Sequence, residues 1–302
     1  MDKLLLFGGN GLVGSRFIEL FSDIFEIKAP SADEVDILNI ESVEKIIQEF
    51  NPDALINFAA YTNVEEAENQ TDDKNGICYQ VNVLGAKNVS KVCQDLDKFL
   101  IHISTDYVFD GQKDSPYTEE DSPNPINWYG MTKYLAEEEV KKANGRNCIV
   151  RISMPYRAKY EIKKDIARFF LSELKKGNEI KAIIDQSTTP TFIDNIAKAL
   201  SEIVKTQVEG IYHVSAKGKT SAFEFAKTIA RTFSLDQSLI KGITLAEYAH
   251  SKKAKILKNS ALDCSKFDQE FPGILHSIEE DLHSFKQSVD PDKIGVDEGD
   301  LN

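Results

Sequence analysis

A glycine-rich turn directly after the first apolar segment constrains this sequence more than any other feature. Residues 3–7 form a short apolar run, and residues 8–14, GGNGLVG, follow the spacing G-x-x-G-x-x-G. Glycines let the backbone turn sharply and approach a pyrophosphate closely, and the following helix directs free N–H groups at the phosphates. Because the string lies between a predicted strand and a predicted helix, it has the context that a dinucleotide-binding turn needs. The alternative is a tight strand–helix turn without a ligand.

Short apolar runs alternate with helix-spaced segments through the first half of the chain. The predicted strands cover residues 3–7, 25–29, 53–59, 99–104 and 148–153. The predicted helices cover residues 12–21, 41–50, 79–96 and 128–143. This alternation predicts an α/β fold, a doubly wound parallel sheet (Rossmann) with helices on both faces. The continuous apolar strands fit burial on both sides.

Beyond residue 153 the pattern loosens into a smaller C-terminal substrate lobe. Helices are predicted at 165–176, 195–205, 221–233 and 277–288, and short strands at 179–184 and 210–214. We expect a dinucleotide-binding domain over residues 1–155, with a returning segment near 192–220, and a mostly substrate-binding lobe over 156–289. Residues 290–302 are acidic and poor in apolar side chains, which is typical of a disordered end.

Composition excludes several classes of partner. Of 302 residues, 41% are hydrophobic, enough for a packed core, and the 36 basic against 49 acidic residues give a net charge of −13. That balance argues against nucleic acid or an anionic membrane surface as a partner. No apolar run approaches the ~20 residues that span a bilayer, and there is no signal-peptide layout. The four cysteines and five histidines show no metal-ligand spacing, so we expect a cytoplasmic protein with reduced thiols and no metal.

The end of the second predicted strand bears on the choice of nicotinamide cofactor. NAD-specific sites usually carry an acid at that point, whereas this sequence has KAPS at residues 28–31. The missing carboxylate removes a clash with a 2′-phosphate, and Lys28 or Ser31 could bind one. The sequence therefore favours NADPH, with NADH as the alternative.

A tyrosine followed four residues later by a lysine is the second informative pattern. A carbonyl reductase needs a proton donor, and a lysine one helical turn from a tyrosine can lower the phenol pKa by its charge. Of three such pairs, only Tyr129 and Lys133 lie on a helix directly after a predicted strand of the alternating half. We interpret the other two, Tyr160 with Lys164 and Tyr248 with Lys252, as solvated helix faces.

The strand before that helix ends in three polar residues. Ser104, Thr105 and Asp106 follow the apolar run 99–103, at the edge where open parallel sheets bind their ligands. A hydroxyl group at this edge can donate a hydrogen bond to a substrate carbonyl. The strand end and the tyrosine–lysine helix are therefore expected to form one site.

With these elements in order, the sequence resembles an extended short-chain dehydrogenase/reductase, and more narrowly the dTDP-4-dehydrorhamnose reductase family. The resemblance covers about residues 3–285, and its S-T-D-Y-V-F-x-G string is fairly specific to this branch. The matching stretches are NFAAYTNV at 57–64, VNVLGA at 81–86, STDYVFDG at 104–111, YGMTK at 129–133, DQ at 185–186 with PT at 190–191, and GIYHV at 210–214.

The resemblance implies a set of cofactor contacts. The glycines shape the pyrophosphate turn, residues 36 and 37 flank the adenine, residues after the third strand line the cofactor, and the lysine of the pair holds the nicotinamide ribose. We add the residues next to these in the sequence or in the expected site. The expected cofactor-binding residues are then Gly8, Asn10, Gly11, Leu12, Val13, Gly14, Lys28, Asp36, Ile37, Ala59, Ala60, Tyr61, Asn82, Ser104, Tyr129 and Lys133.

The resemblance also implies the reaction, the NAD(P)H-dependent reduction of a 4-keto nucleotide sugar. Thr105 and Tyr129 would bind the carbonyl oxygen, and Tyr129 would give the proton as hydride arrives at C4 of the sugar. Protein donors matter because charge grows on that oxygen in the transition state. Thr105, Tyr129 and Lys133 are the expected catalytic residues, and a homodimer is the expected assembly. The expected substrate-binding residues are Thr62, Val64, Thr105, Asp106, Tyr107 and Met154.

Two departures from the family pattern fall on the substrate side. After the string RIS at 151–153 the family commonly has an aromatic residue, whereas this chain has Met154. Near the C-terminus the family tends to have Arg-Pro before an Asn-Ser-x-Leu string, whereas here Ile256, Leu257 and Lys258 precede it. Both departures leave the cofactor chemistry intact and argue against dTDP-4-dehydrorhamnose itself as the sugar.

Two other functions stay open. One is a nucleotide-sugar epimerase or dehydratase on the same fold, and a dehydratase would want an acid pair where Asp106 is followed by Tyr107. The other is a non-catalytic regulatory subunit that resembles the methionine adenosyltransferase beta subunit. The retention of Thr105, Tyr129 and Lys133 counts against a pure binding protein.

Overall fold

A parallel sheet of six strands forms the centre of the computed structural model, which describes residues 1–162 and 164–289. The predicted acidic tail, 290–302, lies outside the described residues. The strand order is β2-β1-β3-β4-β5-β9, and every neighbouring pair is parallel. The predicted α/β fold is confirmed. The strands are β1 (Lys3–Phe7), β2 (Glu26–Lys28), β3 (Ala54–Asn57), β4 (Phe99–Thr105), β5 (Asn147–Ile152) and β9 (Gly210–Val214).

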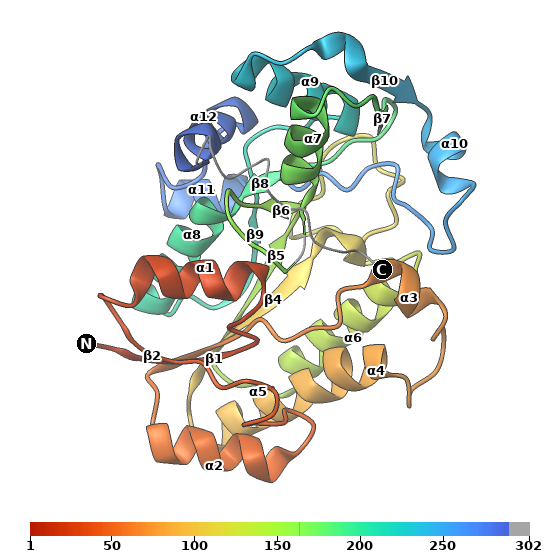
Figure 1. The fold of residues 1–302 in the computed structure, drawn as a ribbon. Helices are drawn as coiled ribbons and strands as arrows, with labels where there is room; N and C mark the ends of the chain where they lie inside the picture. Colours follow the sequence, from red (N-terminus) through yellow and green to blue (C-terminus); the bar gives the residue numbers. More distant parts are fainter. Residues whose placement is uncertain (163, 290–302) are drawn as a thin grey trace.

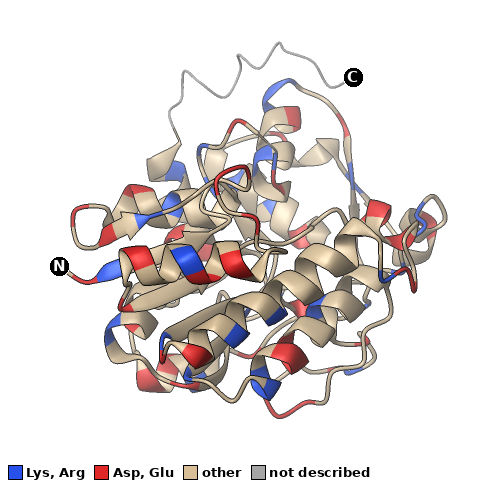
Figure 2. Ribbon diagram, turned by 90° about the horizontal axis from the view of Figure 1, so that it is seen from below, with Lys and Arg blue, Asp and Glu red and all other residues tan. Residues whose placement is uncertain are grey.

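Helices cover both faces of this sheet (Figure 1). On one face lie α1 (Leu12–Phe21), α8 (Ile193–Thr206) and α11 (Ser265–Glu270), and on the other lie α2 (Ile40–Phe50), α5 (Ala86–Asp95) and α6 (Trp128–Lys142). The central strands β1, β3, β4 and β5 are buried on both sides, which explains their nearly continuous apolar sequences. Figure 2 shows Lys and Arg interspersed with Asp and Glu along the helices, as expected for their solvent-facing sides.

The strand order reverses between β1 and β3, and this point fixes where a ligand can bind. The chain leaves β1 toward β2 and returns through α2 to β3, on the other side of β1. Open α/β sheets bind ligands in the crevice at the carboxyl ends of the strands that flank such a switch point. Here the crevice lies between residues 8–9 after β1 and residues 58–61 after β3. Backbone approach is closest at Gly8, where an added methyl group would lie 2.6 Å from the amide nitrogen of Ala59.

The helix predicted over residues 79–96 is divided. It consists of α4 (Ile77–Tyr79), a π-helical segment η1 (Gln80–Gly85) and α5. Gly85 lets η1 pack closely on the segment after β2, because a methyl group there would lie 2.4 Å from Cδ1 of Ile37. Widened helical turns of this kind occur frequently at functional sites, and this one carries Asn82.

A smaller lobe sits above the sheet in Figure 1. Its core holds the buried rings of Tyr156, Phe192, Phe225 and Phe285, which pack against one another. β10 was not predicted, because its sequence IKGI has no clear alternation. The lobe's elements are β6 (Pro155–Tyr156), α7 (Ile166–Lys175), β7 (Ile180–Ile183), β8 (Thr191–Phe192), α9 (Ala222–Phe233), β10 (Ile240–Ile243), α10 (Leu245–Ala249) and α12 (Ile278–Ser288).

Three short elements complete the described chain. They are α3 (Val64–Glu68) and the 3-10 turns η2 (Asp106–Val108) and η3 (Gln237–Leu239). Within residues 1–162 and 164–289, no helix combines the length and apolar character needed to cross a membrane. All four cysteines are buried and free.

Candidate active site

The glycine turn leaves the N-terminus of α1 open to an anion. Gly11 precedes the helix without a side-chain cap, and the first turn carries no acidic residue. The first amide groups of a helix lack intrahelical partners, so those of α1 can bind phosphate oxygens. The turn is tight, since a methyl group on Gly14 would lie 2.8 Å from Cα of Gly9. These residues fit the pyrophosphate of a dinucleotide.

The smaller lobe contacts this turn directly. The Tyr160 hydroxyl donates to the carbonyl oxygen of Asn10 at 3.1 Å, and buried Arg157 donates to the carbonyl oxygen of Leu12 at 3.2 Å. The interpretation of Tyr160 as part of a solvated helix face is therefore wrong, because the residue lies outside any helix and binds the glycine turn. Leu12 and Val13 are half-buried beside it.

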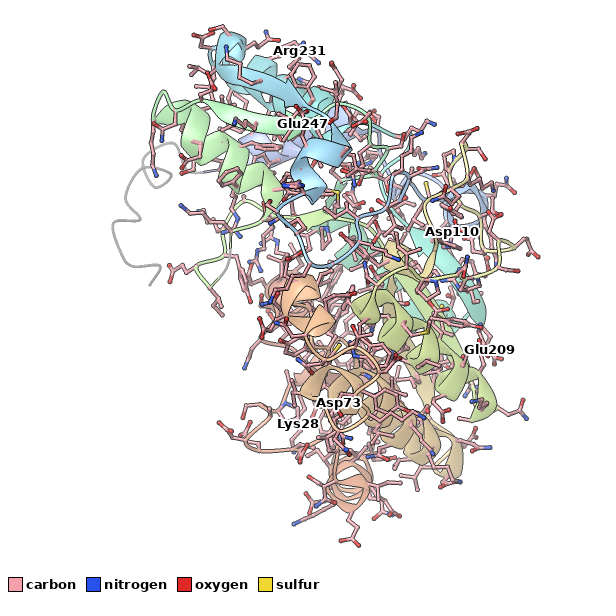
Figure 3. The ribbon with its side chains drawn as sticks, turned by 90° about the vertical axis from the view of Figure 1, so that its right-hand side faces the viewer. Lys28, Asp73, Asp110, Glu209, Arg231 and Glu247 are labelled. Carbon is pink, nitrogen blue, oxygen red and sulfur yellow. The ribbon has the colours of Figure 1, made fainter. Side chains whose placement is uncertain are left out.

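The loop after β2 contains an acid, Glu34, that the sequence pattern did not single out. The backbone N–H and the hydroxyl of Ser31 both donate to Oε2 of Glu34, at 2.8 and 3.1 Å. Lys28 is exposed in the lower part of Figure 3, with its Nζ 5.6 Å from the centroid of the Phe50 ring. The predicted phosphate ligand Ser31 is thus already bonded to a carboxylate.

The segments beyond β2 and β3 form the next part of the crevice wall. Asp36 is exposed and accepts a hydrogen bond from the backbone N–H of Leu38, whereas the Ile37 side chain is buried in the core. Half-buried Ala59, Ala60 and Tyr61 follow β3. The expected adenine and ribose contacts of these residues stay predictions.

Asn82 fixes the chain after β3. Its Oδ1 accepts from the backbone N–H of Tyr61 at 2.7 Å, and its Nδ2 donates to Oγ1 of Thr132 at 2.9 Å. Thr132 is on α6, so the amide joins the crevice wall to the helix that carries Tyr129. This contact gives Asn82 a bracing role in the site.

Helix α6 presents Tyr129, Lys133 and Glu137 on one face, at four-residue spacing. The helix begins after Asn127, whose side chain accepts from the backbone N–H of Gly130 at 2.9 Å. The Lys133 side chain is buried and its Nζ donates to the carbonyl oxygen of Ile103 at 2.6 Å. Burial lowers the pKa of Lys133 to about 8, with Glu137 acting in the opposite direction.

Glu137 holds α6 on the sheet through a buried ion pair. Its carboxylate is fully buried and accepts from Nε and Nη2 of Arg151 on β5, at 2.9 and 2.7 Å. The hydroxyl of Ser104 donates to the same carboxylate at 2.5 Å. The Ser104 side chain therefore faces α6, and its expected cofactor contact stays a prediction. Glu137 was not predicted as a site residue, although it follows Lys133 by four residues in the sequence, which is one helical turn.

Thr105, Asp106 and Tyr129 form a hydrogen-bonded chain at the end of β4. The Thr105 hydroxyl donates to Oδ1 of Asp106 at 2.9 Å, and Thr105 is also hydrogen-bonded to Tyr129. Because the single Thr105 proton goes to Asp106, the phenol of Tyr129 is the donor in the second bond. The hydroxyls of Ser153, at 2.8 Å, and Ser260 also bond the buried Asp106 carboxylate.

The pKa of Tyr129 differs from the expected one. Burial raises the pKa of Tyr129, and the hydrogen bond that the Thr105 hydroxyl can donate to the ionised phenol lowers it only in part. The Nζ of Lys133 is bonded to the carbonyl oxygen of Ile103 in this structure, so the expectation that Lys133 lowers the phenol pKa stays a prediction. The raised pKa keeps the phenol of Tyr129 protonated, as a proton donor must be.

A cavity of about 510 Å³ lies between the sheet and the smaller lobe. Among the predicted substrate residues, Val64, Tyr107 and Met154 line it, whereas Thr62 is exposed outside its lining. The Tyr107 ring meets the Tyr129 ring edge-on at 5.7 Å between centroids, which connects the cavity to the proton donor. Met154 has a φ of 40°, a left-handed backbone that non-glycine residues rarely adopt and that clusters at functional sites.

Four further residues of the sequence analysis lie in or near this cavity. Ile256 lines it, whereas Leu257 is buried beside Phe109 outside the lining. Tyr248 and Lys252 also line the cavity, with Nζ of Lys252 5.2 Å from the centroid of the Tyr248 ring. The interpretation of this pair as a solvated helix face is wrong, because the pair faces the space between the lobes.

We predict that Gly130→Ala destabilises the protein and separates α6 from the end of β4. A methyl group at this position would lie 2.1 Å from the carbonyl oxygen of Tyr107, which is backbone and cannot rotate away. Overpacking of this kind costs about 1–3 kcal/mol. Urea denaturation measures the change in the free energy of unfolding. Gly145→Ala is the control, since its nearest atoms lie at 3.3 Å and its effect is expected to be small. Equal stability of the Gly130 variant and the wild type would contradict the close packing.

The protein has a dinucleotide-type glycine turn at the switch point of a doubly wound sheet and a Tyr-x-x-x-Lys helix beside the end of β4. This combination defines an extended short-chain dehydrogenase/reductase. Sequence comparison narrows this class. The family model described as RmlD substrate binding domain matches residues 2–290, and the chain belongs to that family.

Individual relatives agree with this assignment. The dTDP-4-dehydrorhamnose reductase of Aggregatibacter actinomycetemcomitans is 31% identical over 284 residues, which cover 90% of this chain and 94% of the relative. Methionine adenosyltransferase 2 subunit beta of Rattus norvegicus is 29% identical, over 88% of this chain and 81% of the relative. The crystal structure of dTDP-4-dehydrorhamnose reductase from Bacillus anthracis in complex with NADP superimposes with a TM-score of 0.87 and 31% identity, over 95% of this chain and 99% of that chain.

Proposed function

We propose that this chain is an NAD(P)H-dependent reductase of a 4-keto nucleotide sugar. One observation carries the proposal: the phenol of Tyr129 is hydrogen-bonded to Thr105 at the end of β4, with Lys133 one helical turn away and the cavity-lining ring of Tyr107 against its own ring. The reductases from Aggregatibacter actinomycetemcomitans and Bacillus anthracis match nearly the whole length of the chain, and the one from Bacillus anthracis was crystallised with NADP.

Each side chain has a distinct part in this proposal. Bound reduced nicotinamide supplies the hydride. Tyr129 turns its single proton from Thr105 to the carbonyl oxygen of the substrate and gives it up there, and Thr105 keeps the phenol in position. The ammonium group of Lys133 stabilises the negative charge that develops on the phenol, and it also binds a ribose hydroxyl. Charge stabilisation of this kind is worth most in a site that excludes water.

We propose that the chain has two functional parts. Residues 1–155 hold the cofactor, through the glycine turn and the segments after β2 and β3, and residues 156–289 supply most of the substrate contacts. We place the reaction in the cytoplasm and the protein in a homodimer. Sedimentation equilibrium tests the assembly, and a monomer at micromolar concentration would remove the dimer from the proposal.

The direct test is a panel of 4-keto nucleotide sugars incubated with NADPH or NADH. The expected result is loss of the reduced nicotinamide absorbance with one sugar and formation of the corresponding 4-hydroxy product. An epimerase would interconvert 4-hydroxy sugars without net consumption of NADPH, and a dehydratase would release a 4-keto-6-deoxy sugar from a 4-hydroxy one. Absence of turnover across the panel, with intact cofactor binding, would overturn the reductase assignment.

A regulatory subunit is the second candidate, and the substrate side is the observation that favours it. Met154 stands where the family has an aromatic residue, and the family's arginine is replaced by the segment of Ile256. The relative methionine adenosyltransferase 2 subunit beta shows that the family includes a protein described as a subunit. Cofactor binding without any turnover is the outcome that would favour this function.

The charge of Glu34 is expected to oppose NADPH. Its carboxylate is bonded to Ser31 just beyond β2, where a 2′-phosphate would lie in this fold. Glu34→Gln removes the like charge, so we expect the KM for NADPH to fall by about three- to tenfold while the KM for NADH changes little. Steady-state kinetics with both cofactors measures this ratio. Glu49→Gln changes the net charge equally at the far end of α2 and serves as the control. An unchanged NADPH/NADH ratio would exclude Glu34 from cofactor selection.

A further inference from the structure

Asp106 is a buried carboxylate without a cation beside it. The residue is 2% exposed, and among residues 1–162 and 164–289 no Lys, Arg or His nitrogen lies within 4.0 Å of its oxygens. Two other acids are buried as deeply, but Glu137 is paired with Arg151, and Asp281 lies 3.7 Å from Nδ1 of His276. Burial without a nearby positive charge favours the neutral form of a carboxyl group. Asp106 is therefore suited to take up and release a proton.

Three hydroxyl groups surround this carboxylate. Oδ1 accepts from Thr105 at 2.9 Å, Oδ2 accepts from Ser153 at 2.8 Å, and the hydroxyl of Ser260 is bonded to it as well. Burial raises the pKa of Asp106, and these hydrogen bonds lower it only in part. A hydroxyl group can accept one hydrogen bond while it donates another, so each of these groups can pass a proton on.

The titratable neighbours of Asp106 are two phenols. Tyr107 on η2 and Tyr129 at the start of α6 have their pKa raised by burial, and the charge of Asp106 raises it further. The other two segments packed against the carboxylate contribute the uncharged Ser153 and Ser260. Both phenols keep their protons at neutral pH, so Asp106 is the group of this cluster that can change its charge there.

The cluster connects the reacting phenol with the cavity. Tyr129 is bonded to Thr105, and Thr105 to Asp106. Asp106 is bonded in turn to Ser260, which lines the cavity. All four side chains belong to buried or half-buried residues. Through this chain of side chains a proton can pass between the cavity and the phenol.

We propose that Asp106 returns a proton to Tyr129 after each turnover. The inference rests on the proposed function, in which Tyr129 protonates the carbonyl oxygen of the sugar and is left as a phenolate. The Thr105 hydroxyl then gives its proton to the phenolate oxygen and takes one from the carboxyl group of Asp106. The carboxylate regains a proton from water in the cavity through the hydroxyl of Ser260. One proton enters from water for each proton that the sugar receives, and the hydride comes from the reduced nicotinamide.

The proton on Asp106 also sets the direction of the hydrogen bonds. With Asp106 ionised, Thr105 donates to Asp106 and Tyr129 donates to Thr105. With Asp106 protonated, the carboxyl group can donate to Thr105, and Thr105 can donate to the phenol oxygen. The proton of Tyr129 is then free for the carbonyl oxygen. A hydrogen bond from Thr105 lowers the pKa of Tyr129, and loss of the charge on Asp106 removes an effect that raises it.

Asp106→Asn tests the relay in the full chain with NADPH and an active sugar. The amide group can donate to Thr105 as a protonated carboxyl group does, but it has no proton to release. With enzyme in excess over the sugar, we expect the first turnover to stay within about threefold of the wild type. With sugar in excess, we expect kcat to fall at least about tenfold, because each later turnover waits for the phenolate to regain a proton. The progress curve should show a burst of about one NADPH per site.

Two further variants complete this experiment. Asp281→Asn neutralises a buried carboxylate of the smaller lobe that is bonded to Asn195, and both phases should match the wild type. Ser260→Ala removes the hydroxyl at the cavity and should slow only the later turnovers. A first turnover of Asp106→Asn as slow as its later ones would overturn the relay, and so would an unchanged kcat. An unchanged kcat in Ser260→Ala would overturn the entry of protons from the cavity.

Infrared difference spectroscopy tests Asp106 without turnover. At about pH 5 ordinary exposed carboxyl groups are mostly ionised, so we expect a protonated carboxyl band in the wild type that Asp106→Asn lacks. Absence of this band would overturn the relay, because too few molecules would carry the proton. A wild type that turns over none of the sugars would remove the reductase, whereas an active wild type with no burst in Asp106→Asn would remove the relay alone.

Discussion

Tyr129→Phe is expected to reduce kcat by about 100-fold or more, the usual scale for loss of a positioned acid, and to leave cofactor binding nearly intact. The substitution removes only the phenol oxygen that donates to Thr105, and the ring keeps its edge-on contact with Tyr107. Single-turnover kinetics with NADPH measures the chemical step, and fluorescence titration measures cofactor binding.

Tyr134→Phe is the matched control for this variant. It removes a phenol oxygen from the same helix, five residues further on, in a half-buried ring away from the cavity lining. We expect kcat to stay near that of the wild type. A kcat for Tyr129→Phe within about threefold of the wild type would remove this tyrosine from the mechanism.

Lys133→Met is expected to weaken both the cofactor and the reaction. The methionine keeps much of the buried volume but removes the ammonium group that donates to the carbonyl of Ile103 and faces the ribose in our proposal. A hydrogen bond from a charged group contributes about 1.5–3 kcal/mol, so the Kd for NADPH should rise at least about tenfold. We expect kcat/KM to fall further, by about 100-fold, because charge on the phenol is no longer stabilised.

The pH profile gives a signature specific to this lysine. The pKa of Lys133 is lowered to about 8, so the group loses its positive charge as the pH rises through that value. The wild-type kcat/KM for reduction should therefore fall above about pH 8, since the uncharged amine cannot stabilise the developing phenolate. The Met variant should lack this limb. Lys142→Met, an exposed lysine of the same helix, should keep both the limb and the affinity for NADPH. Unchanged cofactor affinity in Lys133→Met would contradict the ribose contact.

The main sheet could be predicted because its signals are local. The run at residues 3–7, the glycine string and the apolar strand 99–104 are patterns that need no tertiary contact to be recognised. Helix 128–143 was predicted within one residue of α6, since it is long and rich in Glu and Lys. The sequence could not predict β10, four residues that pair with β7 across about sixty residues of chain.

Within the site, the sequence pattern identified the reacting group, the phenol of Tyr129, but not the residues that hold the site together. Ser104 is bonded to Glu137 and Thr105 to Tyr129, and these two partners lie eight residues apart on α6. The strand end and the helix were visible in the sequence, but the contact of Ser104 with the Glu137 carboxylate was not. Similarly, the buried Asp106 carboxylate collects Ser153 and Ser260 from two distant segments, and nothing in the local pattern joins them.

The sequence by itself determined the parallel sheet, the turn suited to phosphate, and the tyrosine and lysine on one helical face, because each depends on backbone geometry over a few residues. Only the tertiary structure decided the environment of those groups. Folding buries Tyr129, which raises the pKa of its phenol, and it brings the Glu34 carboxylate into a hydrogen bond with Ser31. Folding also gathers three lysines from distant segments around one cavity: Lys181, Lys252 and Lys255. Burial and the electrostatic field at a point sum over segments that only folding brings together, so no local pattern contains them.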